Sequence, residues 1–378
     1  MPFDAIVLGL GGMGSAAAFH LARRGHRVLG LDQFPPAHAR GSSHGQTRII
    51  RTAYYEHPGY VPLVRRAFDL WYELEQLAGR PLLIPADCLG LGPSNGDVVT
   101  GVQRSAAEHG LAVETMTGSE VAYRYPAFRP PEEFVGVVEH RAGMLLVEEC
   151  VQAHLNVAAA AGAVLHHDEP VREWKVLGNE VFVTTDRATY RAAKLVVTAG
   201  AWATQLLSDL GVPFRVLRQV MHWFAPPDPT LVRRDRFPVY LIESPAGAYY
   251  GMPMLDARGH KAARHFGAPE LESPAGVDWQ VHPADVAVGT QFVETYLPAA
   301  AGPCTHSQVC MYTATPDRHF VIDVHPKYPH VAVAAGFSGH GFKFAPAVGE
   351  ILADLVEAGR TRQAIGLFAA TRFTRRGS

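Results

Sequence analysis

Apolar residues recur along the chain with two spacings, which predict strands and helices. Apolar runs bounded by turn residues are typical of strands, and apolar positions three to four residues apart are typical of helices. The predicted strands are residues 4–8, 27–31, 163–166, 181–185, 194–202, 320–323 and 331–335, and the predicted helices are residues 15–24, 61–77, 148–162 and 346–357. Residues 81–141 are rich in turn formers, and residues 216–310 are expected to be mixed β.

The first strand, the first helix and the second strand form a βαβ unit with a glycine-rich turn, GLGGMG, after the first strand. Gly9, Gly11 and Gly14 match GxGxxG, whose glycines allow a tight turn, close approach of a pyrophosphate and close packing of helix on strand. Asp32 ends the second strand, where an acid holds a ribose hydroxyl and favours FAD or NAD over NADP. The unit therefore predicts a dinucleotide site.

A second glycine-rich strand–turn–helix, residues 331–357, bears on the choice between FAD and NAD, because an NAD domain does not need it. The helix that begins near Pro346 is suited to stabilise negative charge on a reduced flavin ring. An ordinary glycine-rich turn is an equal alternative, so the spacing alone leaves the cofactor open.

The order of elements predicts an α/β (α+β) fold in two domains. Residues 1–82, 150–215 and 320–378 are expected to form a discontinuous, Rossmann-like nucleotide-binding domain. Residues 83–149 and 216–319 are expected to form a mostly β substrate domain with a large mixed sheet.

The charge balance argues against several classes of partner. The 378 residues include 36 acidic and 34 basic side chains, a net charge of −2, which gives no electrostatic case for nucleic acid or an anionic membrane. Only five of the basic residues are lysines, so arginine is the usual cation of this chain. The four cysteines form no CxxC pair, and neither a zinc ribbon nor a disulfide scaffold is indicated.

The apolar stretch from Ala5 to Leu21 is not expected to be an export signal, because it lacks a basic flank and is broken by glycines. No other run approaches the ~18 apolar residues that span a bilayer. The chain is therefore expected to be a soluble, cytoplasmic protein.

Three longer motifs resemble a known family. GSSHGQTRIIR (Gly41 to Arg51), CMYTATPDRHFVID (Cys310 to Asp323) and AAGFSGHGFKF (Ala334 to Phe344) closely resemble the monomeric sarcosine oxidases, which belong with N-methyltryptophan oxidase to the D-amino-acid-oxidase-like flavoproteins. The similarity runs in order through nearly the whole chain. It implies a glutathione-reductase-type FAD-binding domain, one FAD per chain and a monomer.

The resemblance also implies a covalent flavin, bonded through its 8α-methyl group to Cys310. The alternative is that Cys310 is a small buried hydrophobe, the usual fate of a free cysteine. His44, Thr47 and Arg48 are expected near the flavin, and Arg48 shares a face with Arg51 if the segment forms a helical turn. The expected FAD-binding residues, besides Cys310, are Gly9, Gly11, Gly14, Asp32, His44, Thr47, Arg48, Val171, Gly200, Gly339, Gly341 and Lys343.

The same resemblance implies a substrate site. Arg51 and Lys343 match a clamp for the substrate carboxylate, since arginine grips with two parallel bonds and lysine adds a point charge. Lys261 matches a lysine that promotes the reaction of reduced flavin with oxygen, where a buried cation stabilises superoxide as it forms. The expected catalytic residues are Arg48, Arg51, Tyr250, Lys261, His265, Tyr312 and Lys343.

Three basic residues near Lys261 depart from the family pattern: Arg258, His260 and Arg264. They either lower the pKa of Lys261 or face away on the alternate side of a strand. His260 and His265 lack a third ligand, so no metal site is expected.

These features predict a flavoprotein oxidase that demethylates sarcosine and other small N-methyl L-amino acids. The products are the amino acid, formaldehyde and hydrogen peroxide, with molecular oxygen as the acceptor. Three alternatives stay open. Two are enzymes: an oxidase of a cyclic or bulky secondary amino acid such as proline, pipecolate or N-methyltryptophan, and a flavin dehydrogenase that does not use oxygen. The third is a non-catalytic dinucleotide-binding or RNA-modifying module, and the near-neutral charge argues against RNA.

Overall fold

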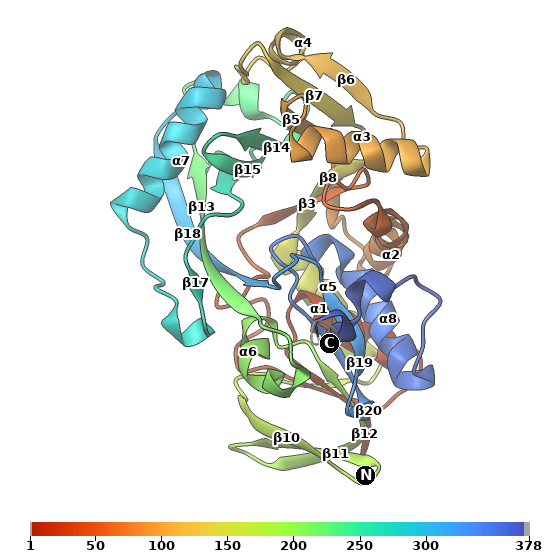
Figure 1. Ribbon diagram of the computed structural model, residues 1–378. Helices are drawn as coiled ribbons and strands as arrows, with labels where there is room; N and C mark the ends of the chain where they lie inside the picture. The colour runs from red at the N-terminus through yellow and green to blue at the C-terminus, as the bar shows by residue number, and fades with distance from the viewer. Residues whose placement is uncertain (1, 374–378) are drawn as a thin grey trace.

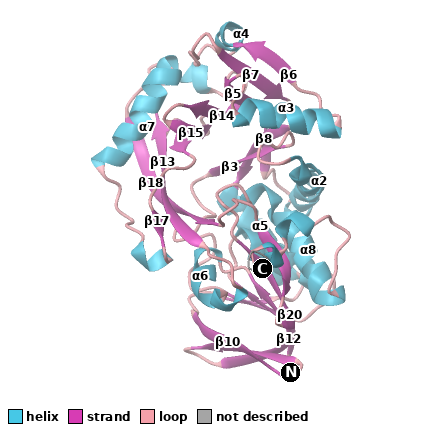
Figure 2. Ribbon diagram, in the orientation of Figure 1, coloured by secondary structure: helices cyan, strands magenta, loops and turns pink. Residues whose placement is uncertain are grey.

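Two large β-sheets, each with helices packed against it, occupy the two ends of the molecule in Figure 1. The computed structural model describes residues 2–373. One sheet has eight strands and lies near both ends of the described chain, and the other has nine strands (Figure 2). A three-stranded sheet accompanies them.

The eight-stranded sheet is built around the glycine-rich βαβ unit. Strand β1 is parallel to β2 on one side and to β12 on the other, and β20 continues the parallel pairing beyond β12. Strands β1 and β2 and the C-terminal ends of β12 and β20 are almost wholly buried, as expected for parallel strands covered by helices. The strands are β1 (Phe3–Leu8), β2 (Val28–Leu31), β9 (Val164–His166), β10 (Val171–Leu177), β11 (Glu180–Thr185), β12 (Thr189–Val197), β19 (Val321–His325) and β20 (Tyr328–Ala335).

Helices cover one face of this sheet and form the largest core cluster with it. Helix α1 packs tightly against α8. The two helices approach so closely that a Cβ built on Gly349 would lie 2.5 Å from the backbone of Ala16. Apolar spacing explains the burial of one side of α2, including Phe68 and Trp71. The helices are α1 (Gly12–Arg23), α2 (Val61–Ala78), α5 (Val147–Ala160) and α8 (Ala345–Ala358), and the short α6 (Ala203–Leu206) follows β12.

The nine-stranded sheet is mixed and carries its own core. Its strands are β5 (Cys88–Pro93), β6 (Glu114–Thr117), β7 (Phe134–Glu139), β13 (Arg215–Phe224), β14 (Val239–Ser244), β15 (Gly247–Met252), β16 (His260–Arg264), β17 (Glu270–Leu271) and β18 (Cys304–Ala314). Its helices are α3 (Asp97–His109), α4 (Gly118–Arg124) and α7 (Pro283–Tyr296). The three-stranded sheet consists of β3 (Thr47–Arg51), β4 (Leu83–Pro85) and β8 (Ala142–Leu146).

This arrangement agrees with the predicted α/β (α+β) class, and it corrects three local expectations. Helix α3 was not anticipated in the turn-rich segment 81–141, and helix α7 interrupts the region expected to be mixed β. The helical turn suggested for Arg48 and Arg51 is wrong, because both lie on strand β3. The domain boundaries at residues 82, 149, 215 and 319 stay a prediction.

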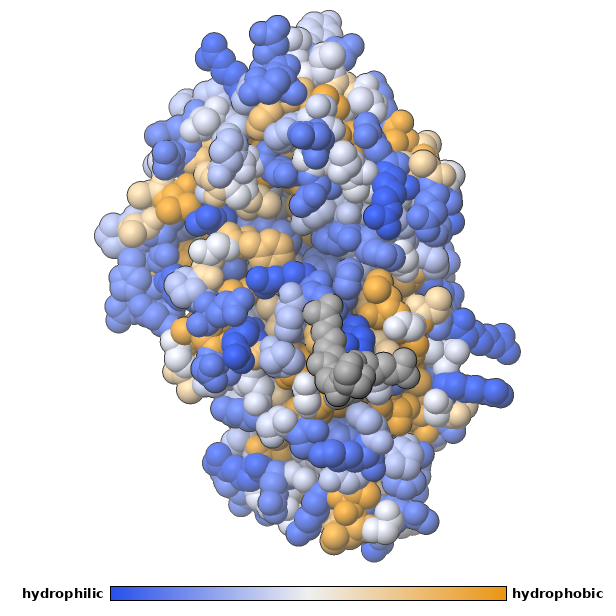
Figure 3. Space-filling model, viewed as in Figure 1, coloured by the Kyte–Doolittle hydropathy of each residue, from blue (hydrophilic) through white to orange (hydrophobic). Residues whose placement is uncertain are grey.

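The molecular surface is mixed in character. On the face seen in Figure 3, hydrophilic residues are interspersed with smaller apolar areas. None of the helices within residues 2–373 has the length and apolar character that a membrane crossing requires.

Candidate active site

The turn after β1 is shaped by glycines for a nucleotide. Gly9 has a φ of 84°, which favours glycine, and a Cβ built on Gly14 would lie 1.7 Å from the Gly9 carbonyl oxygen. A Cβ on Gly11 would touch only Ser43 Oγ at 3.6 Å, so the protein itself leaves room above this residue. That room faces the cavity at the N-terminus of α1, and the N-terminus of a helix favours an anion such as a pyrophosphate.

Asp32 holds the same turn in place from the end of β2. Its Oδ2 accepts a hydrogen bond from the Leu10 N–H at 2.7 Å, and its Oδ1 accepts one from the Phe34 N–H at 2.9 Å. The carboxylate is buried and also lines the cavity. Its contact with a ribose stays a prediction.

One continuous cavity joins this turn to the expected substrate site. It has an empty volume of about 2100 Å³, including the part open to solvent. Thirteen of the predicted site residues line it: Gly9, Gly11, Asp32, Arg48, Arg51, Val171, Gly200, Tyr250, His265, Tyr312, Gly339, Gly341 and Lys343. Four of the others, His44, Thr47, Lys261 and Cys310, are buried and do not line it, and Gly14 packs against Gly9.

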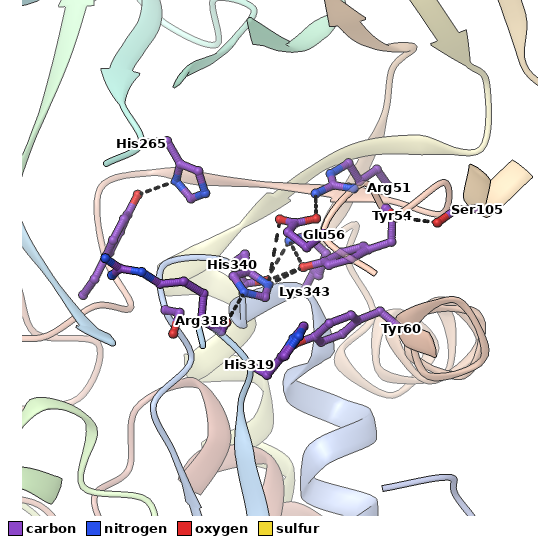
Figure 4. Close-up of polar contacts among 12 residues, drawn as sticks. Arg51, Tyr54, Glu56, Tyr60, Ser105, His265, Arg318, His319, His340 and Lys343 are labelled. Atoms are coloured by element: carbon purple, nitrogen blue, oxygen red, sulfur yellow. Dashed lines mark hydrogen bonds and ion pairs between the residues drawn. The ribbon is translucent and has the colours of Figure 1, made fainter. Parts of the chain in front are cut away.

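Two buried cations from opposite ends of the chain line the cavity near one another (Figure 4). Arg51, on β3, is 2% exposed, and its guanidinium lies 4.1 Å from the centre of the Tyr54 ring. Lys343, in the 3-10 turn before α8, is 5% exposed and donates to the His340 carbonyl oxygen at 2.8 Å. Burial, and then the nearby Arg51 charge, lower the pKa of Lys343 to about 7.

An internal carboxylate, Glu56, lies between these cations and was not anticipated from the sequence. Glu56 Oε2 accepts a hydrogen bond from Arg51 Nη2 at 2.5 Å, and Oε1 is buried without a hydrogen-bond partner in the described chain. Burial alone would raise the pKa of Glu56, but Arg51, His340 and Lys343 outweigh it and lower that pKa to about 2. An acid five residues after the predicted clamp arginine was the only signal for it in the sequence.

His340 and Tyr54 both accept hydrogen bonds from the Lys343 ammonium. His340 Nε2 lies 3.0 Å from the Arg318 carbonyl oxygen, so this nitrogen carries the proton and Nδ1 is the acceptor. The Tyr54 hydroxyl, 2.7 Å from Nδ1, donates to it and accepts from Lys343 Nζ at 3.3 Å. Burial lowers the pKa of His340 to about 4, which keeps the ring neutral near pH 7.

An aromatic wall faces the cavity from the nine-stranded sheet. Tyr250 lies on β15, Tyr312 on β18, and His265 directly follows β16. His265 Nδ1 is 3.2 Å from the Tyr312 hydroxyl, and the His265 and Tyr250 rings meet edge to face at 5.9 Å. Burial lowers the pKa of His265 to about 3, so the wall adds no positive charge near pH 7.

Cys310 lies on β18, and basic side chains from other segments surround it. Its Sγ is 3.6 Å from Arg48 Nη2, and the thiol is 2% exposed. Burial raises the pKa of the thiol, but His44, Arg48 and Lys261 outweigh it and lower that pKa to about 7. Arg48 therefore faces Cys310, whereas Arg51, three residues along the same strand, faces Glu56.

Lys261 is 1% exposed on β16 and donates to the carbonyl oxygens of Gly45 at 2.8 Å and Thr47 at 2.9 Å. Burial, and then Arg48, lower its pKa. His260 and Arg264 lie on the opposite face of the strand and bond to Ala300 and Ala246.

Comparison with known proteins decides the class of cofactor. The sequence model of the FAD dependent oxidoreductase family matches residues 4–355. The chain belongs to this family. FAD, rather than NAD, is therefore the dinucleotide for which the turn after β1 is shaped.

The chain groups with the amine oxidases of the family. A monomeric sarcosine oxidase of Streptomyces avermitilis is 44% identical over 371 residues, which cover 97% of this chain and 96% of that protein. An N-methyl-L-tryptophan oxidase of Salmonella agona is 36% identical over 359 residues, 94% of each protein. The resemblance seen in the motifs is thus confirmed.

Solved structures confirm the predicted fold class. The open form of NikD, described as an unusual amino acid oxidase, superposes with a TM-score of 0.86 at 24% identity and covers 97% of both chains. Glycine oxidase from Geobacillus kaustophilus superposes with a TM-score of 0.80 at 22% identity.

Within residues 2–373, no three or more His, Cys, Asp or Glu side chains are grouped to hold a metal ion.

Proposed function

We propose that this flavoprotein is an oxidase of small N-methyl L-amino acids, with sarcosine as the simplest substrate. One observation carries the proposal: the cavity that begins at the dinucleotide turn ends at the buried cations Arg51 and Lys343. A secondary amino acid needs such a clamp for its carboxylate, placed within reach of a redox cofactor. The sarcosine oxidase relatives support the choice of amine.

FAD, when bound, takes two electrons from the amine and passes them to oxygen, which yields hydrogen peroxide. The overall reaction consumes the N-methyl amino acid, water and oxygen, and releases the primary amino acid, formaldehyde and peroxide. The glycines of the turn after β1, together with Asp32, would hold the nucleotide half of FAD. Cys310 would anchor the flavin ring covalently, because basic neighbours lower the pKa of the thiol to about 7 and favour the thiolate nucleophile. The new carbon–sulfur bond would replace a C–H bond of the 8α-methyl group, and the two electrons released would pass to oxygen.

Substrate binding is assigned to the two cations and the aromatic wall. A bound carboxylate brings a second negative charge beside Glu56, so it raises the pKa of Lys343 and fixes the ammonium form. Tyr250, His265 and Tyr312 would orient the amine, and the neutral His265 ring adds no charge that repels it. Lys261, buried on β16, would stabilise the negative charge that develops on oxygen.

The test is a substrate panel with two readouts. Sarcosine, N-methyl-L-alanine, L-proline, L-pipecolate and N-methyl-L-tryptophan are assayed for turnover, and peroxide is measured per turnover. One peroxide per sarcosine demethylated supports the proposal. Preference for a cyclic or bulky amine would favour the alternative substrates, and turnover without peroxide would favour a dehydrogenase.

A bulkier substrate has one structural feature in its favour. Ile49, Leu241 and Met252 line the cavity beside Tyr250, and unbranched side chains such as Met252 adapt to irregular ligands. The panel ranks these substrates directly.

Covalent attachment has its own assay. Yellow colour that stays with acid-precipitated protein means a covalent flavin, and colour released to the supernatant removes that role from Cys310. The monomeric state and the cytoplasmic location stay predictions, and sedimentation of the purified protein tests the first.

A further inference from the structure

The segment before β3 has an unusual backbone. Gly45 and Gln46 both adopt a left-handed conformation, with φ of 88° and 72°. Such a φ is ordinary for glycine but uncommon for glutamine, so the surroundings must hold Gln46 in place. The turn aims two carbonyl oxygens, of Gly45 and Thr47, at Lys261 Nζ.

A carboxylate holds the turn from one side. Glu148, in the first turn of α5, accepts the Gly45 N–H through Oε1 at 2.7 Å. It also accepts the Gln46 N–H, at 3.1 Å through Oε2 and 3.2 Å through Oε1. The backbone of the turn is therefore bound at its N–H groups by Glu148 and at its carbonyl groups by Lys261.

The side chain of Gln46 holds the turn from the other side. Its Oε1 accepts a hydrogen bond from Trp223 Nε1 at 3.0 Å, and its Nε2 donates to Asp256 Oδ2 at 2.8 Å. Trp223 lies directly opposite Lys261 in the sheet, and its ring is 5.3 Å from Lys261 Nζ. Asp256 is in turn paired with Arg258 at 2.6 Å.

We propose that Gln46 is a positioning residue for Lys261: its two side-chain bonds fix the turn whose carbonyl groups orient the Lys261 ammonium. The ammonium has three N–H groups. Two are taken by Gly45 and Thr47, so these two bonds set the direction of the third. The inference rests on the oxygen role proposed above for Lys261.

The first test separates the two half-reactions. Gln46→Ala is compared with wild-type holoenzyme for flavin reduction by sarcosine without oxygen, and for reoxidation of the reduced enzyme by oxygen. Reoxidation is expected to slow roughly 10- to 100-fold, in line with the cost of misplacing a catalytic group, while reduction changes less than about twofold. Gln152→Ala, which removes a half-buried glutamine bonded to Asn156, is the matched control.

A second readout needs no turnover. Amine acetylation followed by mass spectrometry reports how accessible each of the five lysines is. Lys261 and Lys343 are buried in the native protein, whereas Lys327 is exposed and serves as a reference. In Gln46→Ala, Lys261 is expected to react faster and Lys343 to stay protected. Equal exposure of both lysines means general loosening and overturns the inference.

Asp256→Ala interrupts the same chain of bonds at an exposed side chain, so it provides the test if Gln46→Ala does not fold. It is expected to slow reoxidation selectively, and Asp256→Asn, which keeps the acceptor oxygen, to restore most of the rate. Lys261→Met distinguishes a failure of the positioning role of Gln46 from a failure of the oxygen role of Lys261. If Lys261→Met leaves reoxidation unchanged, the oxygen role itself fails. If Lys261→Met slows reoxidation and neither Gln46→Ala nor Asp256→Ala does, only the positioning role fails.

Discussion

Replacing Lys343 by methionine is expected to weaken carboxylate binding and to remove its pH dependence. The substitution keeps a similar chain length but deletes the ammonium from a site where the residue is 5% exposed. A hydrogen bond to a charged group contributes about 1.5–3 kcal/mol, so the dissociation constant of a carboxylate should rise about 10- to 150-fold.

The sign of the pH dependence follows from the lowered pKa of Lys343. In the free enzyme this pKa is about 7, so the ammonium is present below pH 7 and is lost above it. A bound carboxylate favours the charged form, and binding therefore takes up a proton above pH 7. The dissociation constant should be lowest below pH 7 and rise by up to about tenfold per pH unit above it.

Glu56, His265 and His340 do not titrate in the same range, whereas the buried Glu139 and the free Cys310 thiol, each with a pKa of about 7, do. The pKa values of Glu56, His265 and His340 are lowered to about 2, 3 and 4, and the pKa of Arg51 is raised by Glu56 despite burial. Any change in the dissociation constant between pH 6 and 9 that disappears in Lys343→Met is assigned to Lys343.

The assay uses a carboxylate without an amine, such as methoxyacetate, so that ionisation of the substrate does not contribute. Binding is followed by the change in flavin absorption from pH 6 to pH 9, with Lys327→Met as an exposed-lysine control. Wild-type affinity that stays flat across this range, or unchanged affinity in Lys343→Met, would refute the reasoning.

Three further predictions concern the cofactor. Cys310→Ser should release FAD on acid precipitation, because a hydroxyl is a far weaker nucleophile than the thiolate; colour retained in the pellet would assign the bond to another residue. Lys261→Met should slow reoxidation by oxygen about 100- to 1000-fold and spare anaerobic reduction, as measured by stopped flow, whereas equal losses in both steps would contradict that division. Gly14→Ala should lower stability by about 1–3 kcal/mol and reduce FAD content, because its Cβ would overlap Gly9; a melting temperature and flavin content equal to wild type would show that the turn can shift.

Local sequence patterns predicted the elements that depend on local rules. The glycine-rich turn and its flanking strands obey spacing requirements that a few adjacent residues satisfy, and β1, α1 and β2 formed as expected. The amphipathic spacing of residues 61–77 likewise predicted α2, which spans Val61–Ala78.

The two longest helices that were not predicted show where local rules fail. Helices α3 and α7 are rich in valine and contain glycine, a composition that does not favour helix. Their glycines are required by close packing instead: a Cβ on Gly101 would lie 2.2 Å from the Tyr55 carbonyl oxygen, and one on Gly289 would lie 2.7 Å from His222. These neighbours are distant in sequence, so tertiary contact outweighed local propensity.

The candidate active site shows the same contrast between what the sequence predicted and what tertiary contacts decided. Motif resemblance alone named Arg48, Arg51 and Lys343, but it did not reveal that strand alternation sends Arg48 toward Cys310 and Arg51 toward Glu56. The role of Glu56 beside both cations was also not apparent, because an acid in the sequence carries no sign of burial or of its partners.

The sequence by itself determined the nucleotide turn, the family and the residue types available for chemistry. Only the tertiary structure decided that Arg51 pairs with Glu56 while Arg48 contacts Cys310, and which carbonyl groups orient Lys261. The physical reason is that burial, charge pairing and pKa shifts depend on segments that meet only after folding, whereas turns and strands depend on neighbouring residues.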